Sequence, residues 1–304
     1  MYLLLPNLDK YFMLAKSPPN QVRNGLQTVV FAFWLIDYGN RKKHWADLRD
    51  NRFRGLITAS AVSQHLFVND KLAELTMLDE DLLVFFHAQR TGGSALRHVL
   101  ARAFGQDNIF CTQYVDDFQH WDKVSPERLS SMKIFAGHSN FVERDMGRNL
   151  HYISLLRHPV YRIISLYYYC QKHQKHPLHE FAMSNDILGF YRNSIIKRSY
   201  YLNNLMCSRI CGEPDFEKAR DYIESKFLAV GLTDQLGDFV HWLLSSQGIE
   251  PEVLESLQHD SVRYAELIKD EEMVRVIKEG NSEDVALFEY MNSRYFKMDE
   301  SLYP

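Results

Sequence analysis

Short apolar runs alternate with helical patterns along most of the chain. The run Leu82–Phe86 has acidic residues before it and polar residues after it, which is typical of a buried parallel strand. Runs of the same character are Lys133–Ala136, His151–Leu156 and Phe227–Leu232. Helical patterns lie between or after them, at Ser94–Phe104, Val160–Gln171 and Gln235–Ser246. This alternation predicts an α/β fold with a mainly parallel sheet and helices on both of its faces.

Two regions depart from this alternation. The first eighty residues have helical patterns and carry no chemical motif, so we expect a helical N-terminal extension over residues 1–80 and an α/β domain over residues 81–304. Residues 173–221 fit the alternation poorly, which favours a substrate-facing insertion or lid. Two terminal helices are expected at Glu272–Glu279 and Ser282–Tyr295.

Composition and charge limit the classes of function. The 304 residues are 46% hydrophobic and 24% charged, which is close to the average of a globular protein. A net charge of -4 argues against a nucleic-acid binder, because such proteins are usually basic. No apolar run reaches the roughly 18 residues that a transmembrane helix needs, and the N-terminus does not resemble a secretion signal. We therefore expect a cytoplasmic protein without a transmembrane segment.

The first candidate for chemistry is the segment FFHAQRTGGSALR, which joins the first buried strand to a helix. In a parallel α/β sheet this turn lies at the carboxyl end of a strand, where ligands bind. Gly92 and Gly93 let backbone amides face an anion, and the helix N-terminus adds further N–H groups. Arg90, Thr91 and Ser94 add a positive charge and two hydroxyls. The pattern is neither a Walker A loop nor a dinucleotide-binding motif, and an ordinary strand-to-helix turn remains the alternative.

A second candidate is the segment LLRHPVYRIIS, which follows the third predicted strand. Arg157 ends that strand, Pro159 suits the first turn of the next helix, and Ser165 lies two turns into it. An arginine at a strand end and a helical serine can together bind a second phosphate. The alternative is that Arg157 only binds a neighbouring carbonyl.

Together, the two loops resemble those of sulfotransferases that use 3′-phosphoadenosine 5′-phosphosulfate (PAPS). The chain is most similar to the branch that contains the heparan sulfate 2-O- and 6-O-sulfotransferases and bacterial relatives. The resemblance implies a P-loop-like three-layer fold, PAPS as the sulfuryl donor, and no essential metal. It also implies which residues bind the donor: Arg90, Thr91, Gly92, Gly93, Ser94 and Ala95 at the phosphosulfate, and Arg157 and Ser165 at the 3′-phosphate.

One residue departs from the family pattern. The family usually has lysine where this chain has Arg90. Arginine keeps the positive charge and offers a bidentate fork, but it does not give up a proton. We therefore expect charge stabilisation to survive the change, while the placement of the donor group differs.

The attacking hydroxyl needs a base, and His138 is the candidate. It follows the strand Lys133–Ala136 and a glycine, so it lies at the same edge of the sheet as Arg90. In the heparan sulfate 2-O-sulfotransferases a similar Gly-His element supplies the catalytic histidine. His87 ranks second because the family's histidine there looks structural. Glu143 and Asp145, which follow His138, could orient it or contact the acceptor.

The resemblance predicts a hydroxyl-bearing acceptor, a glycan or a glycolipid, and no nucleic acid. A nucleotide-dependent kinase of similar fold and a non-catalytic protein that binds PAP, the desulfated donor, remain as alternatives. A separate question concerns His173, His176 and His179, whose spacing could serve a metal; a polar lid or acceptor-binding segment is the favoured interpretation. The apolar N-terminal helix could mediate a homodimer.

Overall fold

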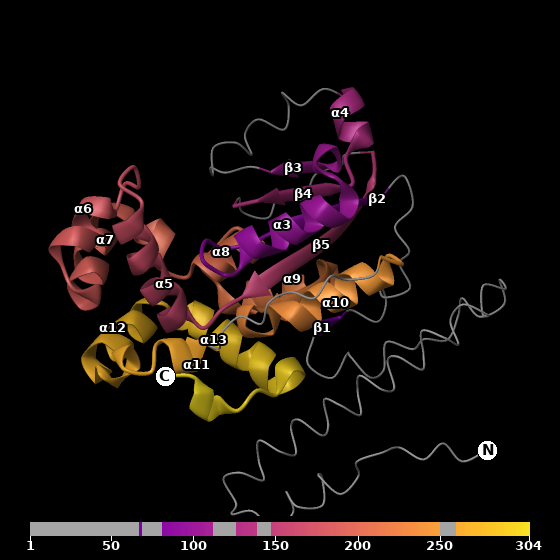
Figure 1. The fold of residues 1–304 in the computed structure, drawn as a ribbon. Helices are drawn as coiled ribbons and strands as arrows, with labels where there is room; N and C mark the ends of the chain where they lie inside the picture. Colours follow the sequence, from indigo (N-terminus) through magenta and orange to yellow (C-terminus); the bar gives the residue numbers. More distant parts are fainter. Residues whose placement is uncertain (1–66, 69–80, 112–125, 139–146, 250–259) are drawn as a thin grey trace, which may run out of the picture. The chain divides into compact units, whose positions relative to one another are not determined.

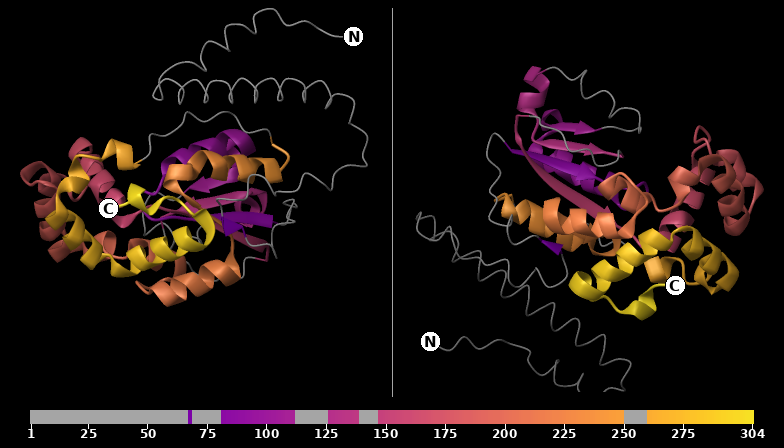
Figure 2. Two further views of the ribbon diagram at one scale, coloured as in Figure 1. Left: turned by 90° about the horizontal axis from the view of Figure 1, so that it is seen from below. Right: turned by 180° about the vertical axis from the view of Figure 1, so that it is seen from behind.

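A computed structural model describes residues 67–68, 81–111, 126–138, 147–249 and 260–304 (Figure 1). All of them belong to the second of two compact units of the chain, residues 59–304. The predicted extension over residues 1–80 therefore lies almost wholly outside the described residues, as do Glu143 and Asp145. Figure 2 shows the same elements from below and from behind.

Six strands form one sheet in the order β1-β6-β5-β2-β4-β3. All neighbours are parallel except β1 and β6, which are antiparallel. The strands are β1 (Phe67–Val68), β2 (Asp81–Phe86), β3 (Ile109–Cys111), β4 (Ile134–Gly137), β5 (Asn149–Leu156) and β6 (Phe227–Leu232). The four predicted strands correspond to β2, β4, β5 and β6, so the predicted mainly parallel sheet is confirmed.

The short edge strand β1 was not expected. Phe67–Val68 lie in the segment predicted to be helical, yet they pair with Val230 and Ala229 of β6. An edge strand leaves a row of N–H and C=O groups unpaired. Two added residues satisfy part of that row, and a pair this short carries no periodicity that a sequence pattern can reveal.

Helices cover both faces of the sheet. On one face, α3 (Gly93–Phe104) and α10 (Leu236–Ser246) pack their apolar sides onto Leu83 and Phe85 of the central strand. On the other, α8 (Leu205–Cys211), α9 (Phe216–Lys226) and α13 (Ser282–Met291) cover the alternate residues of the same strands. Because both faces are buried, the strands appear in the sequence as continuous apolar runs.

The remaining elements connect or flank these layers. The longer helices are α5 (Pro159–Lys172), α7 (Ile187–Leu202) and α12 (Glu271–Gly280), and the short ones are α4 (Pro126–Ser131), α6 (His179–Ser184) and α11 (Asp260–Arg263). The described residues also form a π-helix, Asn292–Phe296, and four 3-10 turns, at Gln106–Asn108, Thr233–Gln235, Leu267–Lys269 and Glu300–Leu302. The expected terminal helices correspond to α12 and α13.

The segment predicted as an insertion or lid is helical. Figure 1 shows α6 and α7 together beside the sheet, joined to it by α5. Their apolar core is shared with α5 and α12 and contains Tyr161, Phe190 and Ile277. Sequence alternation could not resolve these helices because no strands separate them.

The N-terminal ends of α8 and α13, which are distant in the sequence, are joined by hydrogen bonds. Asn204, which precedes α8, accepts hydrogen bonds from the backbone N–H groups of Glu283 and Asp284, while its own N–H donates to Asn281. The buried carboxylate of Asp284 accepts from the backbone N–H groups of Met206 and Cys207. Each helix thus satisfies the orphan N–H groups of the other, which fixes α8 against α13.

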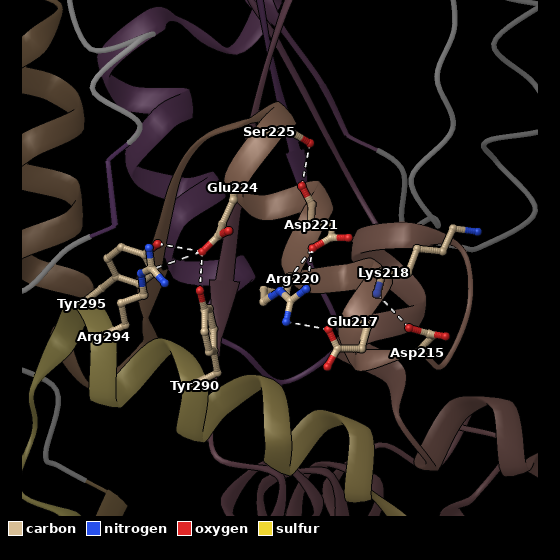
Figure 3. Close-up of polar contacts among 10 residues, drawn as sticks. All are labelled: Asp215, Glu217, Lys218, Arg220, Asp221, Glu224, Ser225, Tyr290, Arg294 and Tyr295. Atoms are coloured by element: carbon tan, nitrogen blue, oxygen red, sulfur yellow. Dashed lines mark hydrogen bonds and ion pairs between the residues drawn. The ribbon is translucent and has the colours of Figure 1, made fainter.

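A polar network on the surface ties α9 to the C-terminal region (Figure 3). The carboxylate of Glu224 accepts hydrogen bonds from the hydroxyls of Tyr290 and Tyr295, and Arg294 lies 3.9 Å from it. The hydrogen bond from Tyr290 is the main cause that lowers the pKa of Glu224 below its ordinary value of 4.5. The ionised carboxylate of Glu224 therefore stabilises the folded state.

We predict that Glu224→Ala lowers the free energy of unfolding by about 1 to 2 kcal/mol at neutral pH, since two hydrogen bonds to a charged group are lost. A carboxyl with a lowered pKa stabilises the folded state above its unfolded-state pKa. That contribution is lost as the pH falls through the lowered folded-state pKa, so the two proteins should converge in acid. Chemical denaturation at several pH values measures this.

Asp221→Ala, in the same helix, is the matched control. Its carboxylate pairs at the surface with Arg220 at 2.8 Å, and an exposed pair contributes little. If Asp221→Ala lowers the free energy of unfolding as much as Glu224→Ala does, the effect is not specific to the hydrogen bonds of Glu224.

Candidate active site

Three loops meet at one edge of the sheet. Residues 87–94 follow β2, His138 follows β4, and Arg157 follows β5. Strand β2 pairs in parallel with both β4 and β5, so the carboxyl ends of the three strands are adjacent. The fold thus brings together residues that are up to 70 positions apart in the sequence, at the edge where such sheets bind ligands.

The loop after β2 has a backbone that most residues avoid. Gly92 has φ +90° and precedes the first turn of α3, where the N–H groups of Ala95 and Leu96 donate to its carbonyl. Arg90 has φ +74°, which is unusual for a residue with a side chain. The hydroxyl of Thr91 donates to the carbonyl of Ala88 at 2.9 Å, so its hydrogen stabilises the loop itself. Such a conformation aims backbone N–H groups at a common point.

The ring of His87 packs against this loop at Gly93. It is buried and stacks on Phe85 with ring centroids 4.3 Å apart. Neither ring nitrogen has a hydrogen-bond partner among the described residues, and burial holds the pKa of His87 well below its ordinary value. A Cβ added at Gly93 would lie 1.9 Å from Nε2 of His87. His87 therefore acts as a neutral packing residue that requires glycine at position 93.

We predict that Gly93→Ala destabilises the fold by more than 2 kcal/mol, because the added methyl overlaps a buried ring that has little room to move. Gly237→Ala is the matched control. It also lies in the first turns of a helix, and its Cβ would meet nothing within 4 Å. The control should be neutral or up to about 1 kcal/mol more stable, since alanine favours a helix over glycine. Chemical denaturation compares the two, and similar effects would contradict the packing role of His87.

Arg157 is the most connected side chain of the site. Its Nε and Nη2 donate to the two oxygens of Asp260, each at 2.6 Å, and its Nη1 donates to the carbonyl of Arg90 at 2.7 Å. The Arg157 and Asp260 side chains are only 6% and 4% exposed. Burial lowers the pKa of Arg157, but the hydrogen bonds and charge of Asp260 outweigh it and hold the pKa above its ordinary value.

The side chain of Arg90 is held by helix α5. Its Nε donates to Oγ of Ser165 at 3.2 Å, and its guanidinium lies 4.5 Å from the centre of the Tyr169 ring. A cation over a tyrosine face is attracted by the ring's negative charge density. Burial and the nearby charge of Arg157 lower the pKa of Arg90, which still leaves a guanidinium charged at neutral pH.

His138 lies on the other side of the loop. Its Nδ1 is 3.4 Å from the carbonyl of His87, and the two rings are 4.3 Å apart. A carbonyl only accepts hydrogen bonds, so this contact favours the tautomer with hydrogen on Nδ1 and a free lone pair on Nε2. Burial lowers the pKa of His138 to about 4, and the charges of Arg209, Arg97 and Arg90 add to the effect. The imidazole is therefore neutral at physiological pH.

The predicted site residues come together to different degrees. Arg90, Arg157 and Ser165 are linked by hydrogen bonds, and His138 contacts the same loop through His87. Ser94 and Ala95 are exposed in the first turn of α3. Sequence reasoning missed Asp260 and the role of Tyr169. Three consecutive tyrosines, at positions 167–169, lie in helix α5, and no sequence pattern indicates which of them contacts Arg90.

The three spaced histidines have separate partners. His173 packs on Tyr169, His176 contacts the thiol of Cys170, and His179 contacts the carbonyl of Cys170. Within the described ranges, no three His, Cys, Asp or Glu side chains form a group that could hold a metal. In the same ranges, no helix is long and apolar enough to span a membrane.

Comparison with protein families assigns the chain to a class. Residues 73–261, more than half of the chain, match the sulfotransferase family, and the chain therefore belongs to it. Among solved structures, the mouse sulfotransferase SULT7A1 complexed with PAP is similar, with 12% identity, 76% coverage of each chain and a TM-score of 0.35. No curated protein sequence matches. The predicted family is thereby confirmed.

Proposed function

We propose that this chain transfers a sulfuryl group from PAPS to a hydroxyl of a carbohydrate or glycoconjugate. The observation that carries the proposal is the link between two phosphate-type subsites. Arg157 and Ser165, eight residues apart on one strand-to-helix connection, both bind Arg90 of the loop after β2. A donor with phosphates at its 3′ and 5′ positions needs two such subsites side by side, which an ordinary nucleotide does not.

The residues present fit this donor. The amides of residues 91–94, the hydroxyl of Ser94 and the charge of Arg90 suit the phosphosulfate. Arg157 and the hydroxyl of Ser165 suit the 3′-phosphate; Ser165 accepts from Arg90 and keeps its own hydrogen to donate. When bound, PAPS supplies an activated sulfuryl group on a phosphate leaving group.

The proposed reaction is a single in-line displacement. The acceptor oxygen forms a bond to sulfur as the bond between sulfur and the bridging oxygen breaks, and PAP leaves with that electron pair. His138 takes the acceptor proton at Nε2. The Arg90 charge and the loop amides stabilise the negative charge that grows on the bridging oxygen.

Aromatic side chains beside Arg90 support a carbohydrate acceptor. Tyr169 contacts the guanidinium of Arg90 and the ring of His173, and the ring centroids of Tyr169 and His173 are 4.0 Å apart. His176 lies edge-on to Tyr169 at 5.7 Å. Aromatic rings with polar edges offer both an apolar face and hydrogen bonds, which suits a sugar ring.

We predict that PAP stabilises the protein against heat more than ADP or ATP with magnesium does. At 100 times its dissociation constant, a ligand adds about 2.7 kcal/mol, which shifts the melting temperature by several degrees. Arg157→Ala should lose the advantage of PAP over ADP, since only PAP carries a 3′-phosphate. Thermal unfolding of both proteins with the three ligands measures this.

Arg192→Ala is the control for this variant. Arg192 lies on α7 and pairs at the surface with Glu272, so the variant removes an exposed arginine outside the loop and should keep the full response to PAP. An equal or larger shift with ATP and magnesium would contradict the proposal and favour a kinase. Stabilisation by PAP without sulfation of any acceptor would favour a non-catalytic PAP-binding protein.

We further predict that His138→Asn lowers kcat by 100-fold or more, because general-base catalysis is typically worth that factor. The affinity for PAP should be retained. In the wild type, kcat/KM should be independent of pH from about 5.5 to 8 and fall only near pH 4, where His138 gains a proton. A pH series of initial rates tests both statements.

His241→Asn provides the comparison, since His241 is an exposed histidine of α10 and should leave the rate unchanged. Near-normal activity in a His138→Asn protein that still binds PAP would remove His138 from the role. An acid limb near pH 6.5 in the wild type would point to a different, more exposed base.

A further inference from the structure

Asp260 binds the arginine that the proposed function assigns to the 3′-phosphate. The pair joins residues 103 positions apart, and both of its hydrogen bonds are 2.6 Å long. Asp260 is also held in place itself, since it begins α11 and its backbone N–H donates to Asp234 at 3.1 Å. A fixed carboxylate thus faces the guanidinium of Arg157.

The geometry of the pair leaves part of the guanidinium available. A guanidinium has five N–H hydrogens. The carboxylate of Asp260 accepts the hydrogen of Nε and one hydrogen of Nη2. The carbonyl of Arg90 accepts one hydrogen of Nη1. One hydrogen on each of the two terminal nitrogens has no acceptor among the described residues. Two N–H groups on one planar fork match the oxygens of a phosphate.

The carboxylate also determines which way the fork points. An arginine side chain has several rotatable bonds, and in a buried place its charge needs a partner. Asp260 supplies the charge partner from one side, and the Arg90 carbonyl fixes the plane from another. The ring of Tyr264, one turn after Asp260, lies 6.0 Å from the same guanidinium.

We propose that Asp260 is a positioning residue for recognition of the 3′-phosphate, acting through Arg157. This inference rests on the proposed function and adds a residue to it. Because the carboxylate cancels the net charge of Arg157, recognition depends on directed hydrogen bonds rather than on attraction to any anion. Asp260 should therefore matter for the 3′-phosphate and not for the rest of the nucleotide.

The test compares two ligands that differ by that one group. Isothermal titration measures the affinity of wild type and Asp260→Asn for PAP and for adenosine 5′-phosphate, which lacks only the 3′-phosphate. We expect Asp260→Asn to weaken PAP about tenfold and to change adenosine 5′-phosphate less than twofold. A merely structural role would weaken both ligands by the same factor.

Two further variants complete the design. Glu272→Gln makes the same carboxylate-to-amide change in the exposed pair with Arg192 and should alter neither affinity. If Asp260→Asn does not fold, Asp260→Glu keeps the charge but displaces it by one methylene, and it should lower the preference for PAP at least threefold.

Each outcome has one meaning. An unchanged preference for PAP in the Asp260 variant that folds would overturn the positioning role, and tighter PAP binding would show that Asp260 competes with the phosphate instead. If the wild type itself has no preference for PAP, the donor assignment is wrong and this inference falls with it. A wild type that prefers PAP separates the two questions.

Discussion

The geometry of the site depends on one buried guanidinium. Arg157 follows β5, and its hydrogen bonds reach the loop after β2 and the start of α11, so it joins three parts of the chain that are distant in the sequence. Its bond to the Arg90 carbonyl supports a backbone with φ +74°, a conformation that persists only where its surroundings fix it. The ion pair with Asp260 compensates the buried charge, since breaking such a pair leaves a costly unpaired charge.

Strand order makes this arrangement possible. Because β2 lies between β4 and β5, the loop that follows it has Arg157 on one side and His138 on the other. The two sides differ electrostatically: one has a charged guanidinium with a fixed partner, and the other has a histidine that burial keeps neutral. In the proposed reaction, one side holds phosphate and the other accepts a proton, and a single glycine-containing turn separates the two tasks.

The sequence predicts those features of the molecule that depend on residues close together in the chain. Buried parallel strands are continuous apolar runs, so Leu82–Phe86 and Phe227–Leu232 were predictable, as was the loop whose glycines permit its turn. The partners of that loop were not all predictable. Asp260 is an ordinary aspartate in a polar stretch, and its meaning comes only from a pairing across 103 residues. Similarly, the hydrogen bonds that the segments around Asn204 and Asn281 exchange are visible only in three dimensions.

The resemblance to sulfotransferases implies a lysine at the position of Arg90, and the structure indicates how an arginine is held there. A lysine is a compact charge that can donate a proton, whereas a guanidinium stays protonated and needs orientation. Ser165 and the Tyr169 ring supply that orientation here. A phosphate leaving group has a second pKa near 6 and is stable as a dianion at neutral pH, so it needs charge stabilisation more than a proton. Under the proposed function, a fixed arginine therefore meets the chemical demand, provided that its neighbours on α5 keep it in place.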